Sequence, residues 1–275
     1  MNLTDVKAMM FDIDGTLVNI KREMSKNLYE ALKKLKENGY KLAINTGRPW
    51  LGAQKVVDMS YPAKDLFDYY FAYNGAELFD NINKKTTLLG KIDSEYIKEL
   101  ALYFKTEHIS LAVYDKTNTY MLFNHFIDNM EAVNYWTSLR FVKPELCDFS
   151  KNTYSPPKCL ILFEPEYYDE LVEMVRKLNS DKVDILRSGE HCLEVIPKGV
   201  SKASAVERYA EIIGVDKKQI LCFGDAESDV SALQCGLGVF VGNSLDPKEY
   251  GIEYQCGSVY EDGIVKFVKE NGFID

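Results

Sequence analysis

Two aspartates, Asp12 and Asp14, lie two residues apart where the apolar run at 8–11 ends. A short apolar run that leads into a glycine-containing turn is typical of a buried strand. Two carboxylates held close together repel each other, so one of them tends to take up a proton unless a cation lies between them. Mg²⁺ prefers hard oxygen ligands and is often found beside phosphate groups. The pair therefore favours a site for a divalent cation over the alternative, in which Asp12 caps a turn and Asp14 is solvated.

Three further features carry residue types that suit phosphate chemistry. Asp225 and Asp229 form a second acidic pair after another apolar run. Thr46 and Gly47 offer a hydroxyl and an unhindered backbone N–H, and Lys202 lies at the start of a helical pattern. Each has an ordinary explanation by itself: a helix cap, a turn or a solvated charge. A lysine at a helix start is unfavourable with the helix dipole, which favours a nearby anion. Together, the four features are difficult to explain by these ordinary roles, so they indicate a functional site.

The elements around these residues predict a parallel sheet. Short apolar runs end in polar, glycine-containing turns, and helical patterns lie between them. The first helix begins after Ser25, repeats leucines on one face and ends before Gly39. Ligands bind at the carboxyl ends of the strands in a doubly wound sheet, so we expect the distant motifs to converge there. The predicted strands span 8–11, 40–44, 220–223 and 237–241, and a helix spans 202–213.

The middle of the chain has a different pattern. Segments 109–114 and 119–123 are typical of the two strands of a hairpin, and a helical pattern follows over 127–139. Further strands are predicted over 159–163, 183–186 and 192–196. This composition indicates a small α+β domain inserted into a parallel α/β domain. We expect residues 1–88 and 195–275 to form the larger domain, and residues 89–194 the inserted one.

Composition excludes several classes of function. The chain has 275 residues, 46% of them hydrophobic and 27% charged, which is typical of a globular protein. Its net charge of −9 argues against a nucleic-acid partner. No apolar run approaches the ~20 residues of a membrane span, and the N-terminus lacks a signal-peptide pattern. Six cysteines without a C-x-x-C pair are expected to be reduced thiols. We therefore expect a cytoplasmic protein with no membrane partner.

The motifs together resemble those of the haloacid dehalogenase-like (HAD) superfamily, and within it the Cof-type phosphatase branch. The matching segments are Asp12-Ile13-Asp14-Gly15-Thr16, Asn45-Thr46-Gly47-Arg48, Lys198-Gly199-Val200-Ser201-Lys202 and Gly224-Asp225-Ala226-Glu227-Ser228-Asp229. The resemblance implies a Rossmann-like doubly wound parallel sheet with a smaller α+β cap domain inserted between the second and third motifs. That insertion point argues against mutase-like relatives, and the acid at position 14 argues against dehalogenase and ATPase relatives.

The resemblance further implies the hydrolysis of a small phosphorylated metabolite, with Mg²⁺ as cofactor. Asp12 would be the nucleophile that forms an aspartyl-phosphate. Asp14 would protonate the leaving alcohol and then activate water. Mg²⁺ would be bound by the Asp12 carboxylate, the backbone carbonyl of Asp14 and Asp225. We expect the protein to be a monomer or a weak homo-oligomer.

Other residues are implied to hold the phosphate and its surroundings. The Thr46 hydroxyl, the Gly47 N–H and Lys202 would position the phosphoryl oxygens, and Lys202 would neutralise charge. Asp229 would orient either a metal-bound water or Lys202. Ser228 departs from the family, which usually has asparagine there, and serine has no amide donor for a contact with phosphate. The catalytic residues are intact, so we expect activity.

Three other functions are compatible with parts of the sequence. A dinucleotide-binding oxidoreductase would need G-x-G-x-x-G after a strand, whereas Gly236, Gly238 and Gly242 are spaced differently and precede or end a strand. A non-catalytic phosphate-binding protein could keep the same fold, although the Asp12/Asp14 pair favours catalysis. A phosphotransferase would use the same core residues, and the sequence leaves this alternative open.

Overall fold

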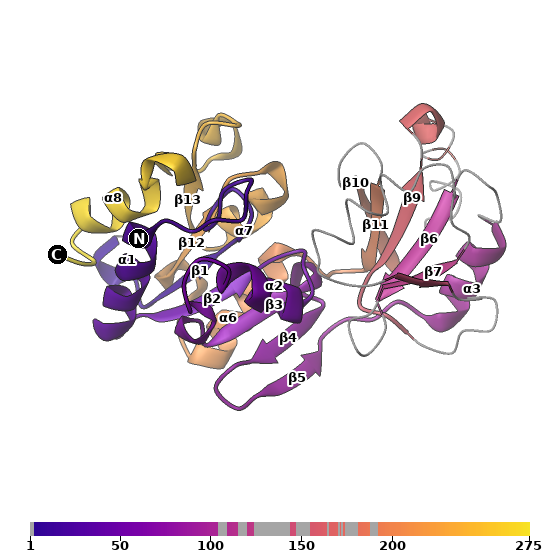
Figure 1. The fold of residues 1–275 in the computed structure, drawn as a ribbon, viewed down its shortest axis with the longest axis horizontal. Helices are drawn as coiled ribbons and strands as arrows, with labels where there is room; N and C mark the ends of the chain where they lie inside the picture. Colours follow the sequence, from indigo (N-terminus) through magenta and orange to yellow (C-terminus); the bar gives the residue numbers. More distant parts are fainter. Residues whose placement is uncertain are drawn as a thin grey trace. The chain divides into compact units, whose positions relative to one another are not determined.

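The computed structural model of the chain describes residues 3–103, 109–114, 120–123, 144–146, 155–163, 165–169, 171, 173, 181–187 and 192–275. The protein divides into two compact units, and each contains its own sheet (Figure 1). The first unit comprises Met1–Thr87 with Val200–Asp275, and the second comprises Leu88–Gly199. The sequence places the second boundary at 194, but strand β11 (Cys192–Pro197) pairs through Pro197 within the sheet of the second unit. The boundary between the units therefore lies after β11 and leaves the whole strand in the second unit.

The sheet of the first unit has eight strands. Their order is β14-β13-β12-β1-β2-β3-β4-β5; neighbours from β14 to β3 are parallel, and β4 is antiparallel to β3. The strands are β1 (Ala8–Phe11), β2 (Lys41–Asn45), β3 (Tyr69–Ala72), β4 (Glu77–Asp80), β5 (Lys85–Leu88), β12 (Ile220–Gly224), β13 (Leu237–Val241) and β14 (Tyr254–Cys256). Because β1 lies between β12 and β2, the carboxyl ends of these three strands meet at one edge. The parallel α/β fold predicted from the sequence is confirmed.

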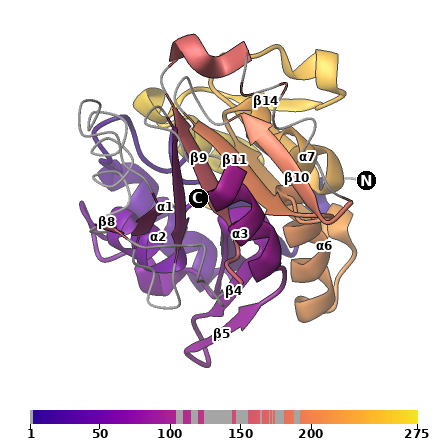
Figure 2. The same cartoon turned by 90° about the vertical axis from the view of Figure 1, so that its right-hand side faces the viewer.

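Helices cover both faces of this sheet. They are α1 (Lys26–Glu37), α2 (Trp50–Val57), α6 (Lys202–Ile213), α7 (Val230–Cys235) and α8 (Gly263–Glu270). Alternate strand residues such as Met9, Phe11 and Ile44 belong to the core cluster that contains α1, α2 and α8. The opposite face carries α6 and α7, where Tyr209 packs edge-on against Phe71. Figure 2 places α1 and α2 on the left of the sheet and α6 and α7 on the right. The sheet is therefore doubly wound.

Local sequence explains where the helices begin and end. The hydroxyl of Ser25 accepts a hydrogen bond from the N–H of Leu28 and so caps α1. This helix buries Leu28, Leu32 and two neighbours, and each buried leucine contributes about 1.5–3 kcal/mol. Helix α6 begins with a capping box between Ser201 and Ser204, and it ends at Gly214. Single 3₁₀ turns span Leu3–Asp5, Lys64–Leu66, Tyr73–Gly75, Lys217–Gln219, Glu227–Asp229, Pro247–Tyr250 and Val259–Glu261.

The second unit has a mainly antiparallel sheet of six strands in the order β10-β11-β9-β6-β7-β8. Its remaining elements are helix α3 (Ser94–Tyr103), strands β6 (Ile109–Tyr114), β7 (Tyr120–Phe123), β8 (Pro144–Leu146), β9 (Cys159–Phe163) and β10 (Val183–Arg187), and a 3₁₀ turn at Pro165–Tyr167. The predicted hairpin is confirmed, since β6 and β7 pair antiparallel. An apolar cluster joins Ile97 and Leu100 of α3 to one face of the sheet. The predicted helix over 127–139 lies outside the described residues.

Within the described ranges, none of the helices combines the length and apolar character needed to cross a membrane.

Candidate active site

The predicted motifs meet at the carboxyl edge of the first sheet. Asp12 follows β1, Thr46 follows β2 and Asp225 follows β12. The three strands are neighbours and parallel, so residues far apart in sequence are placed together. Lys202 is the first residue of α6 and reaches the same edge.

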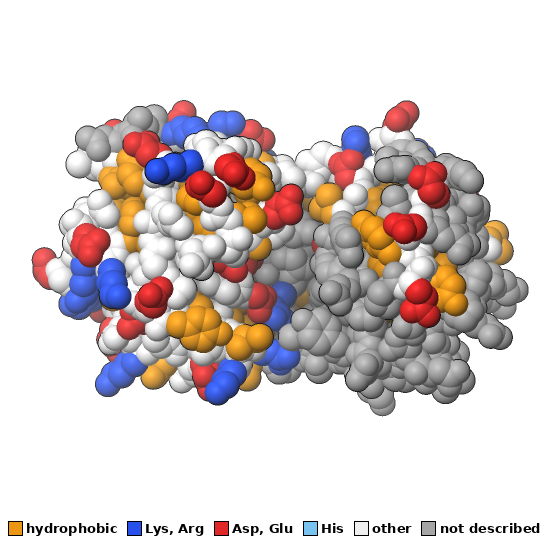
Figure 3. Space-filling view, turned by 90° about the horizontal axis from the view of Figure 1, so that it is seen from above, with side chains coloured by type: hydrophobic (Ala, Val, Ile, Leu, Met, Phe, Trp, Pro, Cys, Tyr) orange, Lys and Arg blue, Asp and Glu red, His pale blue; other side chains and the backbone are white. Residues whose placement is uncertain are grey.

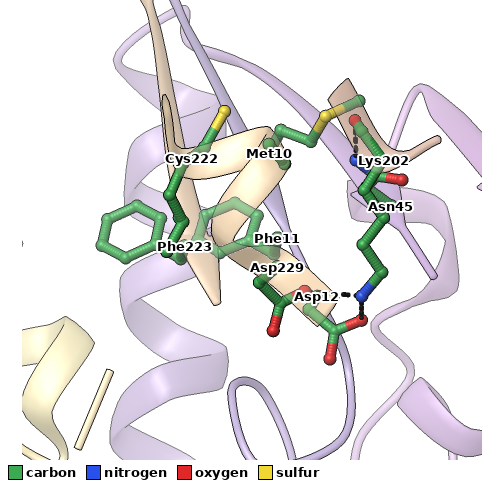
Figure 4. Close-up of a pocket in the computed structure, with 10 residues that line it drawn as sticks. Met10, Phe11, Asp12, Asn45, Lys202, Cys222, Phe223 and Asp229 are labelled. Atoms are coloured by element: carbon green, nitrogen blue, oxygen red, sulfur yellow. Dashed lines mark hydrogen bonds and ion pairs between the residues drawn. The ribbon is translucent and has the colours of Figure 1, made fainter. Parts of the chain in front are cut away.

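Lys202 forms the centre of this cluster. Its ammonium group donates to Oδ1 of Asp12 at 2.7 Å and to Oδ1 of Asp229 at 2.5 Å (Figure 4). All three side chains are buried. The second oxygen of Asp229 accepts from the backbone N–H groups of Asp225 and Ala226. Asp229 therefore links the Lys202 ammonium group to the backbone that follows β12.

Burial and neighbouring charges shift the ionisation of the cluster. Burial raises the pKa of the Asp12 carboxyl to about 8; the Lys202 ammonium opposes this shift, and the charges of Asp229 and Asp14 add to it. Burial lowers the pKa of Lys202, but the contacts with Asp12 and Asp229 outweigh burial and raise it above its ordinary value. Lys202 is therefore a permanent cation, and Asp12 lacks enough positive charge around it to be fully stabilised as a carboxylate.

The donor set fits a divalent cation. Carboxylate oxygens of Asp12, Asp225 and Asp229 lie within 4.8 Å of one another. Burial raises the pKa of Asp225 to about 6, and a hydrogen bond from the Thr16 hydroxyl at 2.8 Å opposes the shift. With all three carboxyls ionised, they share one lysine, which leaves two formal negative charges. A hard divalent ion with oxygen ligands would remove this excess. Because Asp229 is already bonded to Lys202 and two backbone groups, Asp12 and Asp225 are the better ligands.

The Asp14 side chain turns away from this cluster and pairs with Arg48. The guanidinium donates from Nε to Oδ2 and from Nη2 to Oδ1, both at 2.6 Å. The Arg48 side chain is 7% exposed and that of Asp14 is 49% exposed. A bidentate pair of this kind fixes the plane of the carboxylate as well as its position. Asp14 thus presents an oriented, solvent-accessible carboxylate beside the buried one.

The remaining predicted residues lie at the rim of the site. Thr46 is buried, and its hydroxyl oxygen accepts a hydrogen bond from the N–H of Arg48, so its proton can be donated elsewhere. Gly47 is half-buried in the same turn. Ser228 is exposed and forms no hydrogen bond within the described part of the chain. Serine at this position therefore brings no group into the Lys202 cluster.

Comparison with known proteins agrees with this geometry. The family model for haloacid dehalogenase-like hydrolases matches residues 9–268. The chain belongs to this family. It is similar to YxeH of Bacillus subtilis (strain 168), with 26% identity over 96% of this chain and 97% of that protein. It is also similar to the 5-amino-6-(5-phospho-D-ribitylamino)uracil phosphatase YitU of the same organism, with 25% identity over 94% and 95% of the two chains.

Solved haloacid dehalogenase-like structures share the fold. A haloacid dehalogenase-like hydrolase from Bacteroides thetaiotaomicron superposes with a TM-score of 0.82 and 26% identity, covering 96% of this chain and 99% of that one. A sugar phosphatase of HAD subclass IIB superposes with a TM-score of 0.79 and 22% identity over 98% and 100% of the two chains. These two matches thus cover at least 96% of this chain.

Sequence reasoning left two residues of this haloacid dehalogenase-like site without a role. The backbone N–H of Arg48 closes the turn that begins with Thr46. Its position two residues after Thr46 was the sequence signal that could have assigned it to the site. Asn45 is a buried polar residue at the end of an apolar strand, and its amide nitrogen donates to the backbone carbonyl of Lys202 at 2.8 Å. A polar side chain in such a place usually has a specific partner, which the sequence alone does not identify.

Proposed function

We propose that this haloacid dehalogenase-like hydrolase is a phosphatase that hydrolyses small phosphate monoesters, such as sugar phosphates or related metabolites, through an aspartyl-phosphate on Asp12. The observation that carries the proposal is the buried contact of Lys202 Nζ with Asp12 Oδ1, beside a second carboxylate at Asp14. Similarity to the phosphatase YitU and to the HAD subclass IIB sugar phosphatase supports the same class of reaction.

The first step is attack by Asp12 on phosphorus. A bond forms between an Asp12 carboxylate oxygen and phosphorus, and the bond from phosphorus to the ester oxygen breaks. The leaving oxygen takes a proton from Asp14, so the product is a neutral alcohol. Both reacting groups are anionic, and Lys202 reduces their repulsion because its ammonium contacts the nucleophile.

The second step returns the enzyme to its starting state. Asp14, now a carboxylate, accepts a proton from water while the water oxygen attacks phosphorus. The bond between phosphorus and the Asp12 oxygen breaks, which releases inorganic phosphate and regenerates the carboxylate. Arg48 holds Asp14 in one orientation in both steps, and each carboxylate oxygen keeps a further lone pair for the proton.

Mg²⁺ is the proposed cofactor. The carboxylates of Asp12 and Asp225 and the backbone carbonyl of Asp14 would hold it. When bound, Mg²⁺ supplies positive charge that offsets the charge of the phosphoryl oxygens. The Thr46 hydroxyl and the Gly47 N–H are proposed to donate to those oxygens.

The proposed partner is a small phosphorylated metabolite, and the second unit (predicted as residues 89–194) is the proposed cap that selects it. On the face in Figure 3, basic and acidic side chains of the first unit are interspersed, and no large basic patch is visible. This face of the first unit does not favour binding to a phosphate backbone. A cytoplasmic location and a monomeric or weakly associating state stay predictions.

Phosphate release tests the proposal. The full chain is assayed with sugar phosphates, nucleotides, pyridoxal 5′-phosphate and 5-amino-6-(5-phospho-D-ribitylamino)uracil, with Mg²⁺ and with EDTA. Asp12→Asn removes the nucleophile, and Asp5→Asn is the matched control because Asp5 is exposed and precedes β1 at the opposite end of the strand. Acid quenching followed by peptide mass spectrometry detects a phosphoryl group on Asp12.

Turnover that needs both Mg²⁺ and Asp12, with Asp5→Asn unaffected, supports the proposal. Release that persists in Asp12→Asn contradicts the nucleophile. Phosphate binding without release would identify a phosphate-binding protein, and transfer to an added alcohol in preference to water would identify a phosphotransferase.

A further inference from the structure

Asn45 connects two of the proposed phosphate-binding elements. It is the last residue of β2, directly before Thr46, and it is only 3% exposed. Ile44 belongs to the core cluster on the α1 face, so the side chain of Asn45 lies on the opposite face, beside α6. There its Nδ2 donates to the backbone carbonyl of Lys202 at 2.8 Å (Figure 4).

The chemistry of this bond requires a donor at position 45. A backbone carbonyl can only accept, so the amide nitrogen must face Lys202 and the amide oxygen must point away from it. Within the described residues, no protein group pairs with that oxygen. A buried amide with one unpaired oxygen is a poor choice for stability alone. An apolar side chain of similar volume would fill the position without that cost, so the retained amide points to a role in function.

The hydrogen bond from Asn45 holds the backbone of Lys202 in place. Lys202 has a long, flexible side chain, and its ammonium group must reach both Asp12 and Asp229. The capping box at Ser201 and Ser204 fixes the start of α6 but, among the described residues, makes no hydrogen bond to the sheet. Asn45 supplies a direct hydrogen bond from the sheet edge to this helix start.

We propose that Asn45 is a positioning residue, which holds the backbone of Lys202 so that its ammonium group stays between Asp12 and Asp229 when a phosphate binds. The inference rests on the proposed function, because it assigns Lys202 the role of phosphate contact. It also has a part that does not depend on activity: the placement of the ammonium group itself.

The test uses Asn45→Leu, which keeps the volume and removes the donor. Asn38→Leu is the matched control, because Asn38, the C-cap residue of α1, also donates from Nδ2 to a backbone carbonyl, that of Phe273 at 2.9 Å, away from the site. Nuclear magnetic resonance of the lysine ammonium groups in the full chain gives the first readout. The Lys202 signal is identified by its loss in Lys202→Met.

We expect the protected Lys202 ammonium signal to disappear or exchange faster in Asn45→Leu and to persist in Asn38→Leu, with melting temperatures of the two variants alike. We also expect kcat/KM for the best substrate to fall about 10- to 100-fold in Asn45→Leu. In a Lys202→Met background the same substitution should change affinity for inorganic phosphate less than twofold, because the two residues act as one unit.

An unchanged ammonium signal in Asn45→Leu overturns the inference, and so does an effect of Asn45→Leu that persists in full without Lys202. If the signal is lost in Asn45→Leu but the wild-type protein hydrolyses no ester, the positioning role stands and the proposed function fails. The two ideas are thus separated by the same set of variants.

Discussion

Replacing Gly15 with alanine tests whether the position of Asp225 controls metal affinity. Gly15 has a φ of +82°, and a Cβ there would lie 2.0 Å from Oδ2 and 2.5 Å from Cγ of Asp225. Ordinary contact begins near 3.4 Å, so the carboxylate must move by more than about an ångström. The movement is inexpensive for folding, since the end of a side chain can rotate. It nevertheless displaces a proposed ligand and strains its 2.8 Å bond with Thr16.

Two effects of the substitution can be separated. Alanine in the left-handed region costs about 1–2 kcal/mol of stability, whatever surrounds it. Gly39→Ala has the same cost, because Gly39 has a φ of +90° at the end of α1, but nothing lies within 4 Å of its Cβ. Displacement of Asp225 occurs in Gly15→Ala alone, and disturbing the placement of a metal ligand costs about 10- to 100-fold in metal affinity.

Titration calorimetry with Mg²⁺ and the Mg²⁺ dependence of phosphate release measure the affinity of each variant. We expect both alanine variants to melt at similar temperatures and only Gly15→Ala to bind Mg²⁺ more weakly, by about 10- to 100-fold. The reasoning is refuted if Gly15→Ala keeps the wild-type affinity, or if Gly39→Ala loses it to the same extent.

Three further outcomes can be measured. Arg48→Lys keeps the positive charge but loses the bidentate hydrogen bonds to Asp14. Alkyl phosphates need a proton donor for the leaving group, so kcat should fall more for them than for an aryl phosphate. Equal losses of kcat would contradict this. Burial raises the pKa of Glu77 to about 7, so ionisation destabilises the fold as pH rises from about 4.5 through 7. In urea unfolding at pH 8, the free energy of unfolding of Glu77→Gln should then exceed that of wild type by about 3 kcal/mol at most. At pH 4 the two free energies should be equal. Lys158 and Glu194 form a buried ion pair at 2.9 Å, so Lys158→Met alone should lose about 3–5 kcal/mol, whereas adding Glu194→Leu should recover most of it in urea unfolding.

Local signals were sufficient for much of the first unit. Ser25 and Gly39 bracket α1, whose buried leucines repeat at helical spacing, and the predicted strand at 40–44 differs from β2 by one residue. Strand β5 was not predictable, because Lys85–Leu88 is exposed throughout and carries no alternation of apolar and polar residues. It is a strand because of its place at the edge of the sheet, which is information from tertiary structure.

The residues of the site were likewise predictable from the sequence only in part. Asp12 and Lys202 could be selected because their residue types are unusual at a strand end and at a helix start. The roles of Arg48 and Asn45 depend on where each side chain points. Arg48 points toward Asp14, and Asn45 points toward the backbone carbonyl of Lys202 on α6, which is far from it in the sequence. Spacing along the chain contains no information on such directions, so these contacts had to come from the structure.

The distribution of charge in the site explains why a divalent metal should be needed for the substrate to bind as well as for the reaction. Arg48 neutralises Asp14 in a separate, half-exposed pair. Lys202 is shared between Asp12 and Asp229, and Asp225 has only the Thr16 hydroxyl as a side-chain partner in the described part of the chain. The uncompensated negative charge therefore lies where an anionic phosphate must approach, in a chain of net charge −9. Without a divalent ion, such a substrate meets repulsion before any bond can form.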